Sequence, residues 1–155
     1  MFVTDLSSGN KLPVIIEELS DADYKIITKK QFSFNWKLEK EYSVYKLAIS
    51  KSGEILGLMS LNYVDEEYRL QIRLIAVSIE QIGAMKTIDR LTGNLLTYAA
   101  RLAVTRYGLI AAVSLIPKTT LKRHYIDKYG FEESGNSVFI LWPQLQILIK
   151  EYDHD

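Results

Sequence analysis

The sequence contains no cysteine and only two histidines, His124 and His154. The absence of cysteine excludes disulfides, thiolate metal sites and a thiol nucleophile. Two histidines alone do not build a zinc site, which takes three or four protein ligands. We therefore expect a protein without a metal cofactor.

Long apolar runs are also missing. The longest, from Gly108 to Pro117, falls far short of the ~20 residues that a membrane-spanning helix requires. Residues 1–10 carry the acidic Asp5 and hold no apolar run of signal-peptide length. We expect a cytoplasmic protein with no membrane partner.

Neither sign of charge is in excess, because 19 Lys and Arg residues balance 19 Asp and Glu residues. A chain without net charge has no long-range field that attracts nucleic acid, so we expect no nucleic-acid partner. Any anionic ligand must be held by local groups. What the chain does have is 48% hydrophobic residues in a length of 155, which predicts one domain over residues 1–155.

Alternating and short apolar runs dominate the first half of the chain. Lys11 to Leu19 reads as an edge strand with an early proline, and Ser20 and Asp21 can cap a helix over Ala22 to Lys29. Phe32, Phe34 and Trp36 alternate with polar residues and are expected to be extended. Three further strands are predicted, the first two of them joined as a hairpin at Gly53: residues 42–50, 54–63 and 68–78.

The period becomes helical from Ile88, with Gly108 as the stop signal. Leu109 to Ile116 is continuously apolar, which predicts a buried central strand. Thr119 or Thr120 can cap a helix that runs to Tyr129. Residues 137–142 are predicted to form a last strand. Residues 144–152 are predicted to form either a strand or a closing helix. The order predicts a mixed α/β sheet with helices on its faces.

Two motifs resemble the GNAT (GCN5-related) N-acetyltransferase superfamily. One is HYIDKYGFEESG, His124 to Gly135, and the other is the strand end Leu74-Ile75-Ala76-Val77. With the intervening helix and strand, the resemblance covers roughly residues 42–142. It implies a mostly antiparallel sheet with one splayed parallel strand pair and helices on both faces.

The resemblance implies transfer of an acetyl group from acetyl-CoA to a small-molecule or protein amine. Backbone groups of Ile75, Ala76 and Val77 would bind the pantetheine arm as an added strand does. The N-terminus of the next helix would face the pyrophosphate. Lys118, after the buried strand, is a further candidate for holding phosphate or substrate, and Phe32, Phe34 and Trp36 are either an acceptor pocket or plain core.

The phosphate loop of the family is altered here. Arg90 and Thr92 stand where glycines usually let phosphate approach the backbone, and only Gly93 remains nearby. In one interpretation Arg90 and Lys86 hold phosphate by side-chain charge. In the other, Arg90 is a solvated residue on a polar helix face and the CoA site has decayed. The candidate loop also includes Leu91 and Asn94.

The general acid of the family is altered as well. Ile126 occupies the position of the usual tyrosine, and Tyr125 lies one helical step away, a rotation of about 100°. Tyr125 is therefore either a catalytic acid or part of a core stripe. Glu80 is the nearest candidate base, although proximity and carbonyl polarisation can carry much of this chemistry.

Three functions stay open at this point. The first is an acetyl-CoA-dependent N-acetyltransferase, and the second is a catalytically degenerate GNAT-fold binding or regulatory protein. The third is an acyltransferase for longer thioesters. Residues 141–149 are apolar enough to pack on their own domain or to form a homodimer.

Overall fold

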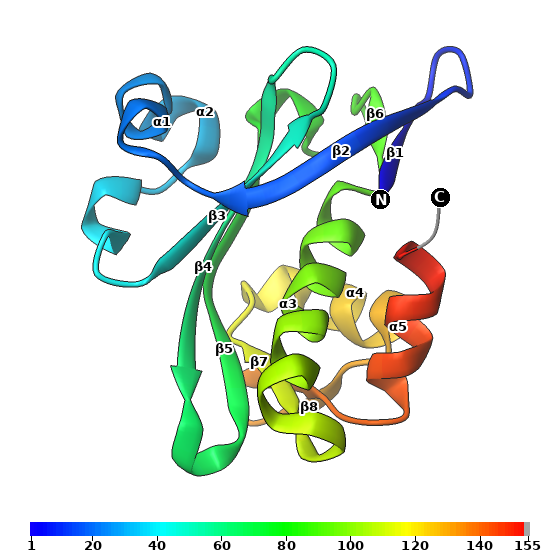
Figure 1. Cartoon of the computed structure of the whole chain (residues 1–155). Helices are drawn as coiled ribbons and strands as arrows, with labels where there is room; N and C mark the ends of the chain where they lie inside the picture. Colours follow the sequence, from blue (N-terminus) through cyan, green and yellow to red (C-terminus); the bar gives the residue numbers. More distant parts are fainter. Residues whose placement is uncertain (154–155) are drawn as a thin grey trace.

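The computed structural model describes residues 1–153, which form one nine-stranded sheet flanked by helices (Figure 1). The sheet order is β6-β1-β2-β3-β4-β5-β7-β9-β8. Its strands are β1 (Phe2–Asp5), β2 (Lys11–Glu18), β3 (Ser43–Ile49), β4 (Ile55–Val64), β5 (Arg69–Val77), β6 (Ile88–Asp89), β7 (Ala112–Leu115), β8 (Glu132–Ser134) and β9 (Ser137–Ile140).

The helices and single turns connect these strands. The α-helices are α1 (Asp21–Ile26), α2 (Lys29–Phe32), α3 (Leu91–Tyr107), α4 (Thr119–Tyr129) and α5 (Gln144–Tyr152). The short 3₁₀ turns are η1 (Trp36–Glu39), η2 (Asp65–Glu67), η3 (Ile79–Gln81) and η4 (Gly108–Ile110).

One parallel pair interrupts an otherwise antiparallel sheet. β5 pairs with β7 only from Arg69 to Ile72, where β7 ends at Leu115, while β5 continues to Val77. The register of β5 against β4 shifts between Ser60 and Leu61, so Arg73 of β5 has no partner and forms a bulge. The predicted splayed pair is confirmed.

The sheet carries a hydrophobic core on each face. Tyr45 and Leu47 of β3 face the larger core, which α3 and α5 cover, and these two helices lie side by side in Figure 1. Val44 and Ala48, at alternating positions, face a smaller core with Phe32. The predicted arrangement of helices on both faces is therefore confirmed.

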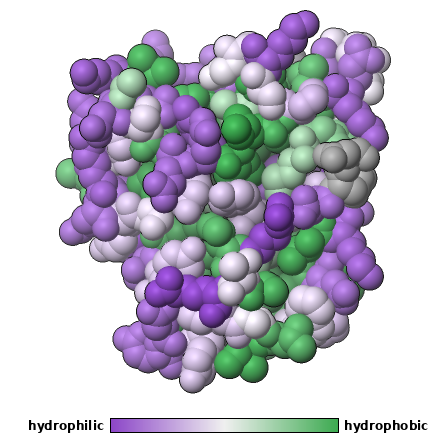
Figure 2. All heavy atoms as spheres, viewed as in Figure 1, coloured by the Kyte–Doolittle hydropathy of each residue, from purple (hydrophilic) through white to green (hydrophobic). Residues whose placement is uncertain are grey.

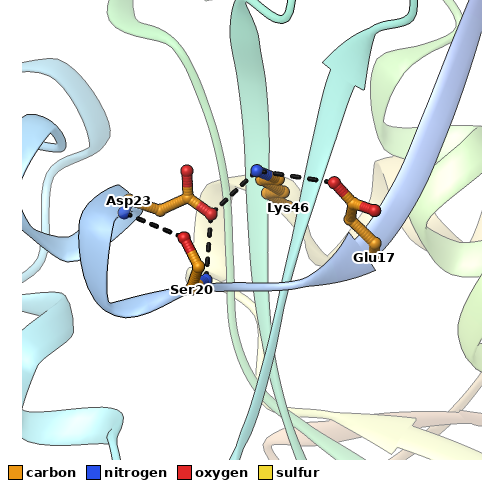
Figure 3. A network of polar contacts seen from close by, with 4 residues as sticks. All are labelled: Glu17, Ser20, Asp23 and Lys46. Carbon is orange, nitrogen blue, oxygen red and sulfur yellow. Dashed lines mark hydrogen bonds and ion pairs between the residues drawn. The ribbon is translucent and has the colours of Figure 1, made fainter.

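The helix α1 is fixed to the smaller face by a polar network (Figure 3). Ser20 and Asp23 form a capping box, in which each side chain accepts a hydrogen bond from the other residue's backbone N–H. Lys46 of β3 donates to Asp23 at 2.8 Å and lies 3.5 Å from Glu17. The predicted cap therefore also joins the helix to the sheet.

Several predictions in the first half need correction. Lys11 to Leu19 is an edge strand only in part, because β1 pairs with Lys11 to Pro13, whereas Val14 to Glu18 pair with β3 alone among the described strands. Phe32 and Trp36 are not extended but lie in α2 and η1, where burial in the smaller core overrides their alternation. The hairpin is confirmed, with Gly53 at a φ of 76°.

The second half differs at three boundaries. Ile88 belongs to β6, paired with β1, so α3 begins three residues later than predicted. Only residues 112–115 of the apolar run form a strand, and Leu109 and Ile110 are largely exposed, consistent with the apolar surface at the end of α3 in Figure 2. Lys118, not Thr119 or Thr120, is the N-cap residue of α4.

The C-terminal segment resolves an open alternative. Residues 144–152 are helical, and Leu145 and Leu148 pack into the larger core of their own chain. Within residues 1–153, no helix combines the length and apolar character that crossing a membrane takes. The same residues contain no cluster of three or more metal-ligating side chains, and His154 lies outside them.

Candidate active site

A cleft of about 330 Å³ opens where β5 and β7 part. The C-terminal stretch of β5 forms one wall and α4 another, and the α2–η1 connection and the loop after η3 line the cleft as well. Residues that represent these walls are Ser33, Phe34, Arg73, Gln81, Lys118 and Tyr125. Phe34 thus lines the cleft, whereas Phe32 and Trp36 are core residues.

Three predicted cofactor residues lie together in this cleft. Ile75, Ala76 and Val77 line it, and beyond Ile72 no strand among the described residues pairs with this edge of β5. An unpaired strand edge presents backbone N–H and C=O groups that an extended ligand can bind. The cleft therefore has the backbone groups that the pantetheine arm requires.

A second hollow of about 120 Å³ adjoins the start of α3. Leu91 and Thr92 line it, and α3 begins without a side-chain cap. The first N–H groups of such a helix attract anions, because they have no intrahelical partner and lie at the positive end of the helix dipole. Lys86 and Lys128 also line this hollow.

Asp89 is the carboxylate of this second hollow. Partial burial raises its pKa, but hydrogen bonds from the Lys86 side chain and the Arg90 backbone outweigh that effect, and the pKa of Asp89 lies below its ordinary value. Lys86 Nζ is 3.0 Å from Asp89 Oδ1. An incoming phosphate would compete with Asp89 for this lysine.

Arg90 lines the second hollow, but its guanidinium reaches toward the C-terminal helix α5. Its backbone has the left-handed φ of 77° that glycine usually adopts, and one terminal nitrogen donates to the Glu151 carbonyl at 2.9 Å. The guanidinium is held between two aromatic rings, at 4.5 Å from Phe2 and 4.6 Å from Tyr152. Arg90 thus joins β1, α3 and α5 rather than lying as a solvated residue on a polar helix face.

Gly93 and Asn94 line neither hollow. A Cβ atom at Gly93 would collide with the ring of Tyr152, so this glycine permits close packing of α3 against α5. Asn94 is fully buried and donates to the carbonyls of Phe2 at 2.8 Å and Arg90 at 2.7 Å. Both residues serve the packing of the helix start.

Tyr125 belongs to the cleft and to an aromatic cluster. Its ring packs against Tyr129 and Phe131 at centroid distances of 5.9 and 5.8 Å. Burial raises the pKa of its hydroxyl to about 12. The group is therefore protonated at neutral pH and can act only as a proton donor there.

The two other predicted residues differ in position. Lys118 lines the cleft at the start of α4. Glu80 is exposed, accepts a hydrogen bond from the Ser78 hydroxyl at 2.6 Å and lines neither hollow. The structure brings Lys118 together with β5 and leaves Glu80 outside.

Arg73 and Lys128 line the hollows although sequence reasoning did not select them. Arg73 occupied a polar position of an alternating strand, and the bulge that directs it into the cleft has no signal in the sequence. Lys128 could have been found, since it lies one helical turn after His124, which lines both hollows.

No protein-family model and no curated protein matches the sequence, but solved structures do. A variant of the SpeG spermidine N-acetyltransferase from Vibrio cholerae has a TM-score of 0.63 at 13% identity, over 86% of this chain and 96% of that one. The structure of AtaTR bound with AcCoA has a TM-score of 0.59 at 15% identity, over 87% of this chain and 97% of that one. The structure of AtaT complexed with acetyl-methionyl-tRNAfMet has a TM-score of 0.57 at 13% identity, over 88% of this chain and 99% of that one. This chain therefore has the fold of the GNAT N-acetyltransferases.

Proposed function

We propose that the protein is an acetyl-CoA-dependent N-acetyltransferase that acts on an amine. The observation that carries this proposal is the open edge of β5 in the cleft, because it offers backbone hydrogen bonds to an extended pantetheine arm. A neighbour with the same fold is bound with AcCoA. The proposal includes a cytoplasmic location.

The phosphates of the co-substrate would lie at the start of α3. Thr92 lines both hollows, so the first turn of α3, whose N–H groups favour anions, borders each of them. Lys86 and Lys128 would supply charge on one side and Lys118 on the other. These lysines would bind the phosphates in place of the backbone N–H groups of a glycine-rich loop. Arg90 does not bind phosphate while its guanidinium is bound to α5.

The reaction is a direct transfer. The neutral amine nitrogen attacks the thioester carbonyl carbon, a C–N bond forms, the C–S bond breaks, the amine loses one proton and the CoA sulfur gains one. Tyr125 would donate the proton to sulfur, since its hydroxyl is protonated at neutral pH. No carboxylate of the described residues lines the cleft, so water would take the proton of the amine.

The second candidate is a GNAT-fold binding or regulatory protein without catalysis. It is favoured by the use of two loop positions for packing, since Arg90 and Gly93 both contact Tyr152. AtaT was solved with a tRNA, so an amine on a nucleic acid is an acceptor class that an assay must include.

The binding test is the melting temperature with acetyl-CoA, free CoA and ATP. A ligand bound only to the folded state raises its stability by mass action. We expect both CoA species to raise the melting temperature, and Lys86→Gln and Lys128→Gln each to weaken acetyl-CoA affinity by roughly 10-fold. Arg123→Gln, an exposed residue that lines neither hollow, is the matched control.

No shift at millimolar acetyl-CoA contradicts the transferase proposal and leaves the second candidate. A shift without turnover of any amine does so as well, since a protein without catalysis can still bind CoA.

Tyr125→Phe tests the proposed acid. We expect kcat to fall by roughly 10²-fold while acetyl-CoA affinity is unchanged, because the variant loses a proton donor and retains the ring. Stopped-assay turnover against pH, with binding measured in parallel, checks this. An unchanged kcat means that Tyr125 is only a packing residue.

A further inference from the structure

The cleft is cationic, although the chain has no net charge. Arg73 and Lys118 line it, and no Asp or Glu of the described residues does. Recognition of a polyamine needs carboxylates, since each ammonium group must be paired when it leaves water. The lining therefore disfavours a polycationic acceptor such as spermidine.

Arg73 faces a different side of β5 from the proposed phosphate site. Ile75 and Val77 pack on the larger core beneath α3, whereas Leu74 and Ala76 pack on the smaller core. The Arg73 side chain reaches η1 on this smaller side. Its charge therefore lies on the smaller-core side of the strand, away from the start of α3.

The guanidinium of Arg73 is held in place by a hydrogen bond from its Nε and by stacking on an aromatic ring. Its Nε donates to Glu39 Oε1 at 3.0 Å, and its Cζ atom lies 3.8 Å from the centroid of the Tyr42 ring. Glu39 is itself buried and accepts from the Ser60 hydroxyl at 2.9 Å. The contacts with Glu39 and Tyr42 restrict the rotamers of the Arg73 side chain, which is 33% exposed.

The two terminal nitrogens of Arg73 make no hydrogen bond to another described residue. A guanidinium whose Nε is occupied still presents a fork of N–H groups that matches a planar oxyanion. Ser33 and Phe34 also line the cleft. The cleft can therefore receive an anionic group at Arg73.

We infer that the acceptor is an amine that carries an oxyanion, a carboxylate or a phosphate, and that Arg73 binds this group. The inference rests on the proposed function and names its substrate class. With the oxyanion on Arg73, the amine of the same molecule would reach the thioester along β5. It would attack the carbonyl carbon as the C–S bond breaks.

The test uses matched acceptors in an assay that measures free CoA thiol. Standard amino acids are compared with their carboxamides, aminoalkyl phosphates and spermidine, which separates carboxylate, neutral, phosphate and polycation arms. We expect one oxyanion class to exceed its neutral counterpart by about 10-fold or more in kcat/KM. A preference for carboxamides or spermidine overturns the inference.

Variants at position 73 assign the preference to this residue. Arg73→Gln is expected to remove it by raising KM for the anionic acceptor about 10- to 100-fold, with little change for the neutral one. Arg73→Lys keeps a charge for Glu39 but loses the fork, so an intermediate preference is expected. Arg123→Gln is the control.

Folding effects are separated by a double variant. Arg73→Gln alone leaves the buried Glu39 carboxylate without its cation, and combining it with Glu39→Gln removes both charges. The double variant must fold, bind acetyl-CoA and lack the preference. An equal loss for anionic and neutral acceptors contradicts the inference. Failure of the wild type to bind acetyl-CoA overturns the proposed function, whereas binding with a polyamine preference overturns the inference alone.

Discussion

Gly93 shows how a residue that resembles part of a ligand loop can instead serve packing. Its helical position faces the ring of Tyr152, and no side chain fits between α3 and α5 at this point. Glycine in a helix normally costs about 0.5–1 kcal/mol relative to alanine. Retaining it here is consistent with a larger steric cost for any replacement.

Gly93→Ala is therefore expected to destabilise the fold by about 1–3 kcal/mol, the range for overpacking, even though the exchange stabilises an exposed helix. Urea unfolding measures the change. Combining it with Tyr152→Ala tests the cause, because residues in contact give non-additive effects. A stabilised Gly93→Ala protein contradicts the packing assignment.

At the residue scale, the sequence predicted which residues of β5 line the cleft, but it did not predict how Arg90 is oriented before α3. Ile75, Ala76 and Val77 could be placed because their strand end resembles that of the GNAT superfamily. The orientation of Arg90 could not, since it depends on Phe2 and Tyr152, which are far away in the chain.

Among the elements, α1 is a short helix whose start is fixed by charge. Asp23 is buried and binds both the Ser20 backbone and Lys46. Burial raises its pKa, but the Lys46 and Ser20 hydrogen bonds prevail, so the pKa of Asp23 lies below the ordinary value of 3.8. Its contribution to stability is thus present above pH 3.8 and is lost as pH falls through the lowered pKa.

Asp23→Asn is expected to cost about 1 kcal/mol at pH 7, and the difference from wild type should shrink as pH falls below 3.8. Urea midpoints measured from pH 7 to pH 2.5 check this. Asp21→Asn, on an exposed residue of the same turn, is the control and should have the smaller effect. A difference that is constant across this pH range would exclude the ion pair as its source.

Elements with their own start and stop signals were predictable. The hairpin depends on Gly53, and the end of α4 depends on Gly130, which adopts a φ of 80°. The strand within 109–116 was overextended because an apolar run carries no period, and η4 with its exposed Leu109 has no local signal. Tertiary packing set those limits.

For the whole molecule, one sheet separates two cores that share strands β3 and β4. Trp36 lies in the smaller core, and the half-buried Trp142 packs against the larger one. Because both cores depend on the same strands, neither is expected to persist without the other.

Single-tryptophan variants test this cooperativity. Trp142→Phe leaves Trp36 as the reporter of the smaller core, and Trp36→Phe leaves Trp142 for the larger one. Within each variant, fluorescence and far-ultraviolet circular dichroism should give one coincident unfolding transition, as expected of a single domain. Separate transitions would divide the chain into two folding units.

The open edge of β5 also bears on solubility. Residues 74–77 (Leu74 to Val77) are apolar, lie beside the cleft and lack a strand partner on one side among the described residues. Such an edge is a template for strands of other chains, and therefore for aggregation. We expect acetyl-CoA to slow the growth of light scattering at temperatures below the melting transition. Acetyl-CoA bound along β5 would thus also protect the protein from self-association.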